Sequence, residues 1–196
     1  MTLQNRFALI STSLLFSWIA FASVLAMPTT AWGNTSNSST RGTVLSVFRV
    51  DQFGRGYAFI KTVRTFSGQT RLFGDFFNNR GVQIRGDVEI GLPNVSGNQV
   101  VPVASSLMNG GYAIAWRNDH PSATGGIRYS VITTEGSYVT RDIRANILYS
   151  ATLQPTQVIG ISHGGFIIAW RDMRTAVNWY RSFTSQGVPT SGDQRN

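Results

Sequence analysis

The segment Gly110-Gly111-Tyr112-Ala113-Ile114-Ala115-Trp116-Arg117 decides the fold, because it recurs as Gly164-Gly165-Phe166-Ile167-Ile168-Ala169-Trp170-Arg171. A weaker copy, Arg55-Gly56-Tyr57-Ala58-Phe59-Ile60-Lys61, lies upstream. The second glycine of each copy stands at position 56, 111 or 165, so the period is 55 and then 54 residues. A nearly constant period of this length predicts a tandem array of similar structural units.

The repeated segment reads as a strand that is buried on both faces. Tyr112, Ile114 and Trp116 share one face of such a strand, and Ala113 and Ala115 share the other. Neither face is polar; one is bulky and the other nearly flat. This pattern predicts sheets that stack face to face, with each bulky face above a small-residue face, as in propeller blades built from four strands.

Alignment on the repeat glycine predicts four strands in each copy, separated by glycine turns. The predicted strands are Thr43–Val50, Tyr57–Val63, Thr70–Phe77 and Val82–Val88, then Val100–Leu107, Tyr112–Arg117, Ile127–Thr133 and Ser137–Ile143, then Thr156–Ile161, Phe166–Arg171, Val177–Thr184 and a short piece near Val188. Gly81, Gly136 and Gly187 each follow a third strand, where a tight hairpin turn needs a positive φ.

The fold is therefore predicted to be all-β, with three tandem four-stranded antiparallel repeats over residues 43–98, 99–154 and 155–196. Propellers usually need at least four blades. Three solutions fit: two chains close a six-bladed ring, the chain is related to a longer array, or the three units form a β-trefoil of twelve strands. The trefoil matches the strand count, but a strand buried on both faces favours blades.

The N-terminal residues predict export. Arg6 precedes an apolar run over residues 7–27, and the small residues Ala31 and Gly33 follow, a pattern typical of a secretory signal peptide over 1–33. A cut after Ala26 is an alternative, and so is an uncleaved anchor, since the run is long enough to span a bilayer. Residues 34–42 are predicted to be a flexible leader before the β-repeat domain at 43–196. The protein is expected to be secreted, periplasmic or on the cell surface.

The charge of the chain points to an anionic partner. The formal net charge is +8, and Lys61 is the only lysine, so arginine supplies nearly all of the positive charge. Arginine binds carboxylates, sulfates and phosphates as a fork, although a GC-rich genome would produce the same excess. Nucleic acid is a poor candidate because the chain is expected to be exported. Cysteine is absent, so no disulfide supports the core.

The basic residues gather in and around the loop that follows the second strand of each repeat. They are Lys61, Arg64 and Arg71 in the first copy, Arg117 and Arg128 in the second, and Arg171 and Arg174 in the third. Because the copies are equivalent, these residues are predicted to form a cationic rim that binds anionic groups. The alternative is a solvated rim whose arginines pair with Asp75, Asp119 and Asp172. Trp179 and Tyr180 are candidates for stacking on a ligand, whereas Trp116 and Trp170 are predicted to pack between blades.

Catalytic chemistry has little support in the sequence. His120 and His163 are the only histidines and lack ligand spacing, so neither a metal site nor a cofactor is predicted. No serine stands in a Gly-x-Ser-x-Gly motif. Asp119 and Asp172 occupy equivalent loops, which leaves a glycan-directed hydrolase as an alternative function.

The segments Gly164–Trp170 and Gly110–Trp116, with the later Gly187 and Gly136, resemble the Gly-Gly-Phe-Val-Val-x-Trp repeats of large secreted bacterial surface proteins. A Gly-x-Gln element also matches, as Gly97-Asn98-Gln99 and Gly192-Asp193-Gln194. The resemblance covers residues 97–194, while Lys61 replaces the tryptophan in the first copy. It implies a propeller-like fold, a role in adhesion or surface display, and no catalytic residue.

Together these features predict a non-enzymatic, exported β-repeat module that binds a glycan or another envelope component, with an anionic ligand favoured. One alternative is a structural subunit that closes a six-bladed ring as a homodimer. The other is the glycan-directed hydrolase. Contact with a membrane is expected only through an uncleaved N-terminal segment.

Overall fold

The computed structural model describes residues 41–93, 95–120, 125–147 and 152–195. All described residues belong to one compact unit. The predicted signal peptide at 1–33 and the leader up to residue 40 lie outside the described residues.

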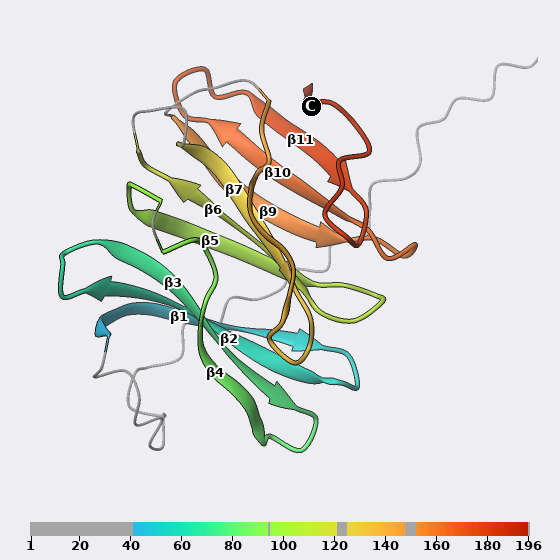
Figure 1. Ribbon diagram of the computed structural model, residues 1–196. Coiled ribbons are helices and arrows are strands. Elements are labelled where there is room, and N and C mark those ends of the chain that lie inside the picture. Colours follow the sequence, from blue (N-terminus) through green and yellow to red (C-terminus); the bar gives the residue numbers. More distant parts are fainter. Residues whose placement is uncertain (1–40, 94, 121–124, 148–151, 196) are drawn as a thin grey trace, which may run out of the picture. The chain divides into compact units, whose positions relative to one another are not determined.

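The described residues form three four-stranded antiparallel sheets, one from each repeat, and we call each sheet a blade (Figure 1). Blade 1 contains β1 (Gly42–Gln52), β2 (Gly56–Thr65), β3 (Thr70–Asn78) and β4 (Gln83–Glu89). Blade 2 contains β5 (Gln99–Ser106), β6 (Tyr112–Asn118), β7 (Gly126–Ile132) and β8 (Tyr138–Arg144). Blade 3 contains β9 (Leu153–Gly160), β10 (Phe166–Asp172), β11 (Asn178–Phe183) and β12 (Gln194–Arg195). In each blade the strands pair in chain order, so the prediction of three tandem four-stranded repeats is confirmed.

The structure excludes the trefoil alternative and corrects the position of one predicted strand. A trefoil would pair strands from different repeats, but every sheet here draws its strands from one repeat. The last strand lies at Gln194–Arg195 rather than near Val188, where only an isolated bridge joins Phe183 to Pro189. Between this bridge and β12 the chain stays bonded to β11: the Thr190 amide donates to the Ser182 carbonyl at 2.9 Å, and the Ser182 amide donates to Ser191 Oγ at 3.1 Å.

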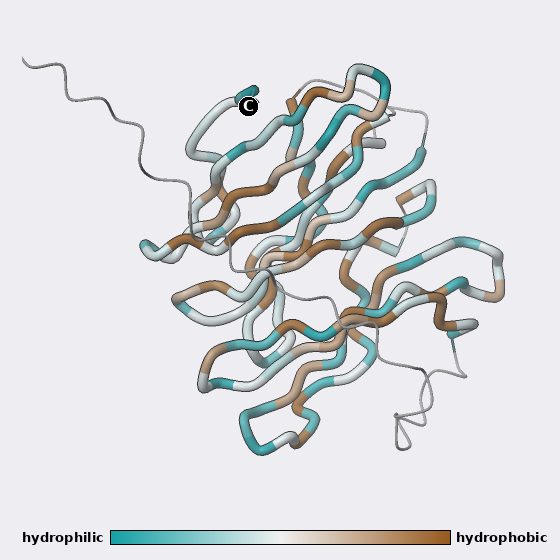
Figure 2. Tube along the Cα trace, turned by 180° about the vertical axis from the view of Figure 1, so that it is seen from behind, coloured by the Kyte–Doolittle hydropathy of each residue, from teal (hydrophilic) through white to brown (hydrophobic). Residues whose placement is uncertain are grey.

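The two faces of the repeated strand pack as the sequence predicts. Tyr112, Ile114 and Trp116 are fully buried against Ala58 and Ile60 of blade 1 in one core cluster. One repeat later the equivalent bulky residues Phe166, Ile168 and Trp170 lie in a second cluster, together with Ala113 and Ala115 of blade 2. Each bulky face therefore covers the small-residue face of the preceding blade. Figure 2 shows the strongly hydrophobic stretches running along the strands, where these faces meet.

The second glycine of each repeat is required by close backbone approach, a role that differs from that of the hairpin glycines. A Cβ at Gly56 would lie 2.0 Å from the Phe77 carbonyl oxygen. At Gly111 and Gly165 the corresponding distances are 2.4 Å to the carbonyl oxygens of Ile132 and Phe183. Real Cβ atoms do not approach oxygen this closely, so only glycine fits. The hairpin glycines have φ of 77°, 79° and 77° at positions 81, 136 and 187, as predicted.

Gly165→Ala is expected to lower the free energy of unfolding by about 1–3 kcal/mol, because the new methyl group forces β10 away from β11. Gly165 is well suited to this test, since its φ lies outside the left-handed range and the effect is therefore purely steric. Gly192→Ala is the matched control, because no atom lies within 4 Å of its Cβ position. Equal urea unfolding midpoints for the two variants would contradict this account of the repeat glycine.

Candidate anion-binding edge

The C-terminal ends of β2, β6 and β10, the second strands of the blades, lie along one edge of the blades, at the left in Figure 1. Hydrogen bonds connect segments along this edge: the Thr70 amide donates to Asn98 Oδ1 at 2.8 Å, and the Asn98 amide donates to Asp119 Oδ1 at 2.5 Å. In blade 3 the Met173 amide donates to the Thr152 carbonyl at 3.0 Å. We call this side the basic edge, defined by Arg41, Arg64, Phe66, Arg71, Arg117, Arg171, Met173 and Arg174.

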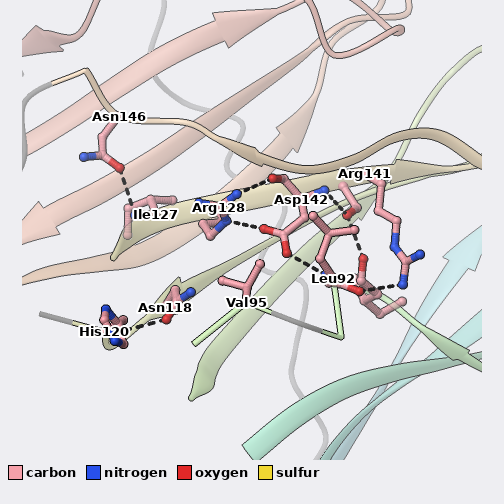
Figure 3. Close-up of polar contacts among 12 residues, drawn as sticks. Leu92, Val95, Asn118, His120, Ile127, Arg128, Arg141, Asp142 and Asn146 are labelled. Carbon is pink, nitrogen blue, oxygen red and sulfur yellow. Dashed lines mark hydrogen bonds and ion pairs between the residues drawn. The ribbon is translucent and has the colours of Figure 1, made fainter. Parts of the chain in front are cut away.

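A buried carboxylate, that of Asp142, holds blade 2 against the segment that connects it to blade 1 (Figure 3). Asp142 has a fully buried side chain, forms an ion pair with Arg128, and accepts a hydrogen bond from the Leu92 amide at 2.6 Å. The Arg141 guanidinium donates to the carbonyl of Gly91 at 2.7 Å. Ser130 Oγ donates to the Ile90 carbonyl at 2.8 Å. These bonds satisfy backbone hydrogen-bonding groups of residues 90–92, which belong to no strand.

An equivalent set of hydrogen bonds occurs one repeat later. The Ile147 amide donates to Asp193 Oδ2 at 2.8 Å, as Leu92 does to Asp142. Arg181 Nη1 donates to the Ala145 carbonyl at 2.8 Å, in the place where Ser130 reaches Ile90. The segments that connect blade 1 to blade 2 and blade 2 to blade 3 are therefore anchored to the blade that follows by hydrogen bonds as well as by the core.

Three of the seven predicted rim residues, Lys61, Arg71 and Arg128, bind acceptor groups of the protein itself. Lys61 is buried and contacts Asp75 Oδ2 at 2.8 Å and Asp87 Oδ1 at 2.7 Å. Burial opposes its charge, but the hydrogen bonds that its ammonium donates to the two carboxylates outweigh that effect and raise the pKa of Lys61. Arg128 forms an ion pair with Asp142, as described above. Asp75 is thus the partner of the buried Lys61, whereas the alternative raised from the sequence paired it with an arginine on a solvated rim.

Arg71 is also buried, and its guanidinium is fixed by three hydrogen bonds. Nη1 donates to the carbonyls of Leu92 at 3.4 Å and Val95 at 2.9 Å, and Nη2 donates to Gln69 Oε1 at 2.7 Å. The four remaining rim residues are more accessible: Arg64, Arg171 and Arg174 are exposed, and Arg117 is half-buried. The structure thus divides the predicted rim into internal cations and surface cations.

A hollow of about 360 Å³ lies at the blade 1 end of the basic edge. Its lining combines two guanidinium groups, two phenyl rings, a carboxyl group and small polar side chains: Arg41, Arg71, Phe66, Phe73, Glu89, Thr65, Ser67, Gln69 and Pro93. Arg41 lies over the Phe73 ring, 4.8 Å from its centroid. Such a cation–π contact orients the guanidinium while its edge stays available to an acceptor.

Glu89 gives the hollow an acidic group among cations. Burial raises the pKa of Glu89, and the charges of Arg71, Arg141 and Arg41 act in the opposite direction. Two arginines against one carboxyl group leave the hollow cationic, with polar acceptors and donors at its rim. A carboxylate or sulfate fits this chemistry better than a cation does.

The turn between β2 and β3 holds Phe66 outward. The Thr65 amide donates to the Gln69 carbonyl at 2.8 Å, and the Gly68 amide donates to the Thr65 carbonyl at 2.9 Å. Gly68 adopts φ of 82°, which the tight turn requires. Because these bonds fix the turn, Phe66 stays 81% exposed at its tip, beside the hollow.

The predicted stacking residues lie elsewhere. Trp179 is partly buried and packs against the core between blades 2 and 3, opposite Trp170 in the strand register. Tyr180 points to the other face of β11 and is half-buried. Trp116 and Trp170 are buried, at 0% and 2% exposure, in agreement with their predicted packing role.

The two carboxylates considered for hydrolysis act as hydrogen-bond acceptors for groups of neighbouring segments. Asp119 accepts the Asn98 amide and, at 3.0 Å, Asn98 Nδ2. Asp172 Oδ1 accepts Thr152 Oγ1 at 2.6 Å and the Arg174 amide at 3.0 Å. These bonds lower the pKa of Asp172, the Thr152 hydroxyl most strongly, which keeps it an acceptor rather than a proton donor. Within the described residues no cluster of three His, Cys, Asp or Glu could hold a metal ion.

Of the residues that line the hollow, the sequence identified only Arg71, and it missed Arg41, Phe66, Phe73 and Glu89 among others. Arg41 was included in the leader, and Phe73 and Glu89 belong to strands whose facing direction the sequence leaves open. Phe66 carried a usable signal, because an aromatic residue between Thr65 and the Ser67-Gly68 pair sits in a turn and has no core to enter.

No model of a known protein family matches the chain, and no curated protein is similar to it. The resemblance to surface-protein repeats therefore stays a prediction. In the part of the chain that the structure describes, no helix is both long and apolar enough to cross a membrane.

Proposed function

We propose that the protein is a non-enzymatic, exported β-repeat module that binds an anionic glycan or another anionic envelope component at its basic edge. The hollow carries the proposal, because it places Arg41 and Arg71 together with an exposed phenyl ring at the mouth. The guanidinium groups match carboxylate or sulfate oxygens, and Phe66 matches the apolar face of a sugar ring.

The positions of Arg71 and Arg41 in the hollow support this proposal. Arg71 is buried and its guanidinium already donates to three protein acceptors, so it adds positive potential to the hollow, while the exposed Arg41 offers its donors to a ligand. The exposed Arg64, Arg171 and Arg174 extend the positive charge along the edge from blade 1 to blade 3. A polymer with repeated anionic groups can contact several of these sites at once.

Binding to polygalacturonate and dextran sulfate is expected, with no binding to neutral dextran. The paired substitution Arg41→Gln with Arg64→Gln is expected to weaken binding about tenfold, because each exposed ion pair contributes up to about 1 kcal/mol. Raising the salt concentration should weaken binding of the unaltered chain as well. Biolayer interferometry over a salt series measures both effects.

The matched control removes the same charge from the opposite edge. Arg55→Gln with Arg80→Gln changes two exposed arginines in the β1–β2 and β3–β4 turns. If this pair weakens binding as much as the Arg41 and Arg64 pair, the protein responds to net charge alone and the assignment of the basic edge fails. Equal binding to neutral dextran would also reject it.

A further inference from the structure

The basic edge exposes hydrophobic residues that anion binding alone does not explain. Phe66 is 81% exposed in the β2–β3 turn of blade 1, and Met173 is 56% exposed in the β10–β11 turn of blade 3. Each follows an exposed arginine by two positions, as Arg64-Thr65-Phe66 and Arg171-Asp172-Met173. Two blades thus present the same combination of a guanidinium and an apolar tip.

Both tips are held outward by their turns. The bonds around Thr65 and Gly68 fix Phe66, as described above. In blade 3 the Asp172 amide donates to the Val177 carbonyl at 2.9 Å, and the Met173 amide donates to Thr152. Neither side chain can therefore fold back into the core without breaking its turn, and both remain available to a partner.

We propose that the basic edge docks on an anionic phospholipid bilayer, with Phe66 and Met173 entering the boundary between headgroups and acyl chains. The exposed Arg64, Arg171 and Arg174 bind lipid phosphates beside them. Apolar tips gain free energy by leaving water at such an interface, and arginines next to them are attracted by its negative surface potential. This inference rests on the proposed function and specifies the envelope component as the membrane surface.

A bilayer accounts for two features that a polysaccharide leaves unexplained. A flat surface can meet the turns of blades 1 and 3 together, and a methionine gains little from a sugar hydroxyl. The opposite edge also exposes Phe53 and Met108 and carries the exposed Arg55 and Arg80, so the two edges differ in the acidic groups beside the apolar residues. There Arg49 is paired with Asp51 at 2.5 Å, and hydrogen bonds from Thr134 and neighbouring groups lower the pKa of Glu135, so that edge carries acidic groups beside its tips.

The opposite edge supplies a matched control. Phe66→Ser and Phe53→Ser each remove one exposed phenyl ring from a turn, and both variants keep the full chain, so any contribution of residues 1–40 is common to them. Sedimentation compares vesicles of phosphatidylcholine with phosphatidylglycerol against vesicles of phosphatidylcholine alone. We expect Phe66→Ser and Met173→Ser each to lower partitioning into anionic vesicles about tenfold, whereas Phe53→Ser leaves it unchanged.

A second measurement shows which residue lies at the membrane. The chain contains no cysteine, so Phe66→Cys or Phe53→Cys provides a single site for an environment-sensitive dye. Anionic vesicles are expected to shift the emission of the dye to shorter wavelength at position 66 and not at position 53. Equal shifts at both positions, or none at 66, would overturn the docking geometry.

The two proposals fail in different ways. If the protein binds polygalacturonate but not anionic vesicles, the membrane inference is overturned and the proposed glycan binding stands. If vesicle binding depends on Arg64 and Arg171 but not on Phe66 and Met173, the attraction is electrostatic only and the insertion is again rejected. Loss of binding to both probes would remove the proposed function as well.

Discussion

Lys61→Met is expected to lower the free energy of unfolding by about 3–5 kcal/mol, the usual cost of leaving buried charges without their partner. Asp75 and Asp87 both contact the Lys61 ammonium, and the side chains of Lys61 and Asp75 are only 11% and 8% exposed. Without the lysine, two carboxylates repel each other in a poorly hydrated place. Urea denaturation followed by circular dichroism measures the loss.

A compensated variant separates charge from packing. Lys61→Met combined with Asp75→Asn and Asp87→Asn removes the whole charged cluster, and we expect it to recover most of the lost stability. If the triple variant is no more stable than Lys61→Met alone, the cluster stabilises through packing and the charge argument is wrong. In the unaltered protein, the raised pKa means that this contribution is fully present below about pH 10.4 and is lost as pH rises through the folded-state pKa.

Trp116→Ala is expected to cost about 3–5 kcal/mol, because it opens a cavity between blades 1 and 2. Trp116 is fully buried and belongs to the cluster that joins Ile60, Leu72 and Phe76 to blade 2. Thermal or urea unfolding measures the effect, and the transition should stay cooperative only if the blades remain in contact.

Two comparisons test the cause. Trp116→Phe keeps most of the ring volume and removes an indole N–H that has no hydrogen-bond partner among the described residues, so its cost should be clearly smaller. Trp179→Ala removes an equally large side chain from a partly buried position and should also cost less. A larger loss for Trp179→Ala than for Trp116→Ala would contradict the stacked-blade core.

The chemistry of the edge was only partly accessible from the sequence. Position 61 illustrates why: the alignment places Lys61 where the other copies have tryptophan, and the sequence suggested a rim cation. In the structure, β3 brings Asp75 and the β4 bulge brings Asp87 to the same place, so the lysine is neutralised internally. Arg71 and Arg128 were assigned to the rim for the same reason and also find partners inside the protein.

The sequence by itself determined the repeat, the strands of the blades except the last strand of blade 3, and the burial of the tryptophan strand. The period of 55 and 54 residues and the alternation of bulky and small side chains are local properties of the chain. Tertiary structure alone decided which arginines reach solvent, where the hollow lies and why the repeat glycines tolerate no side chain. Each of these depends on an atom from a different strand or blade, such as the Phe183 carbonyl beside Gly165, and the distance along the chain does not reveal that proximity.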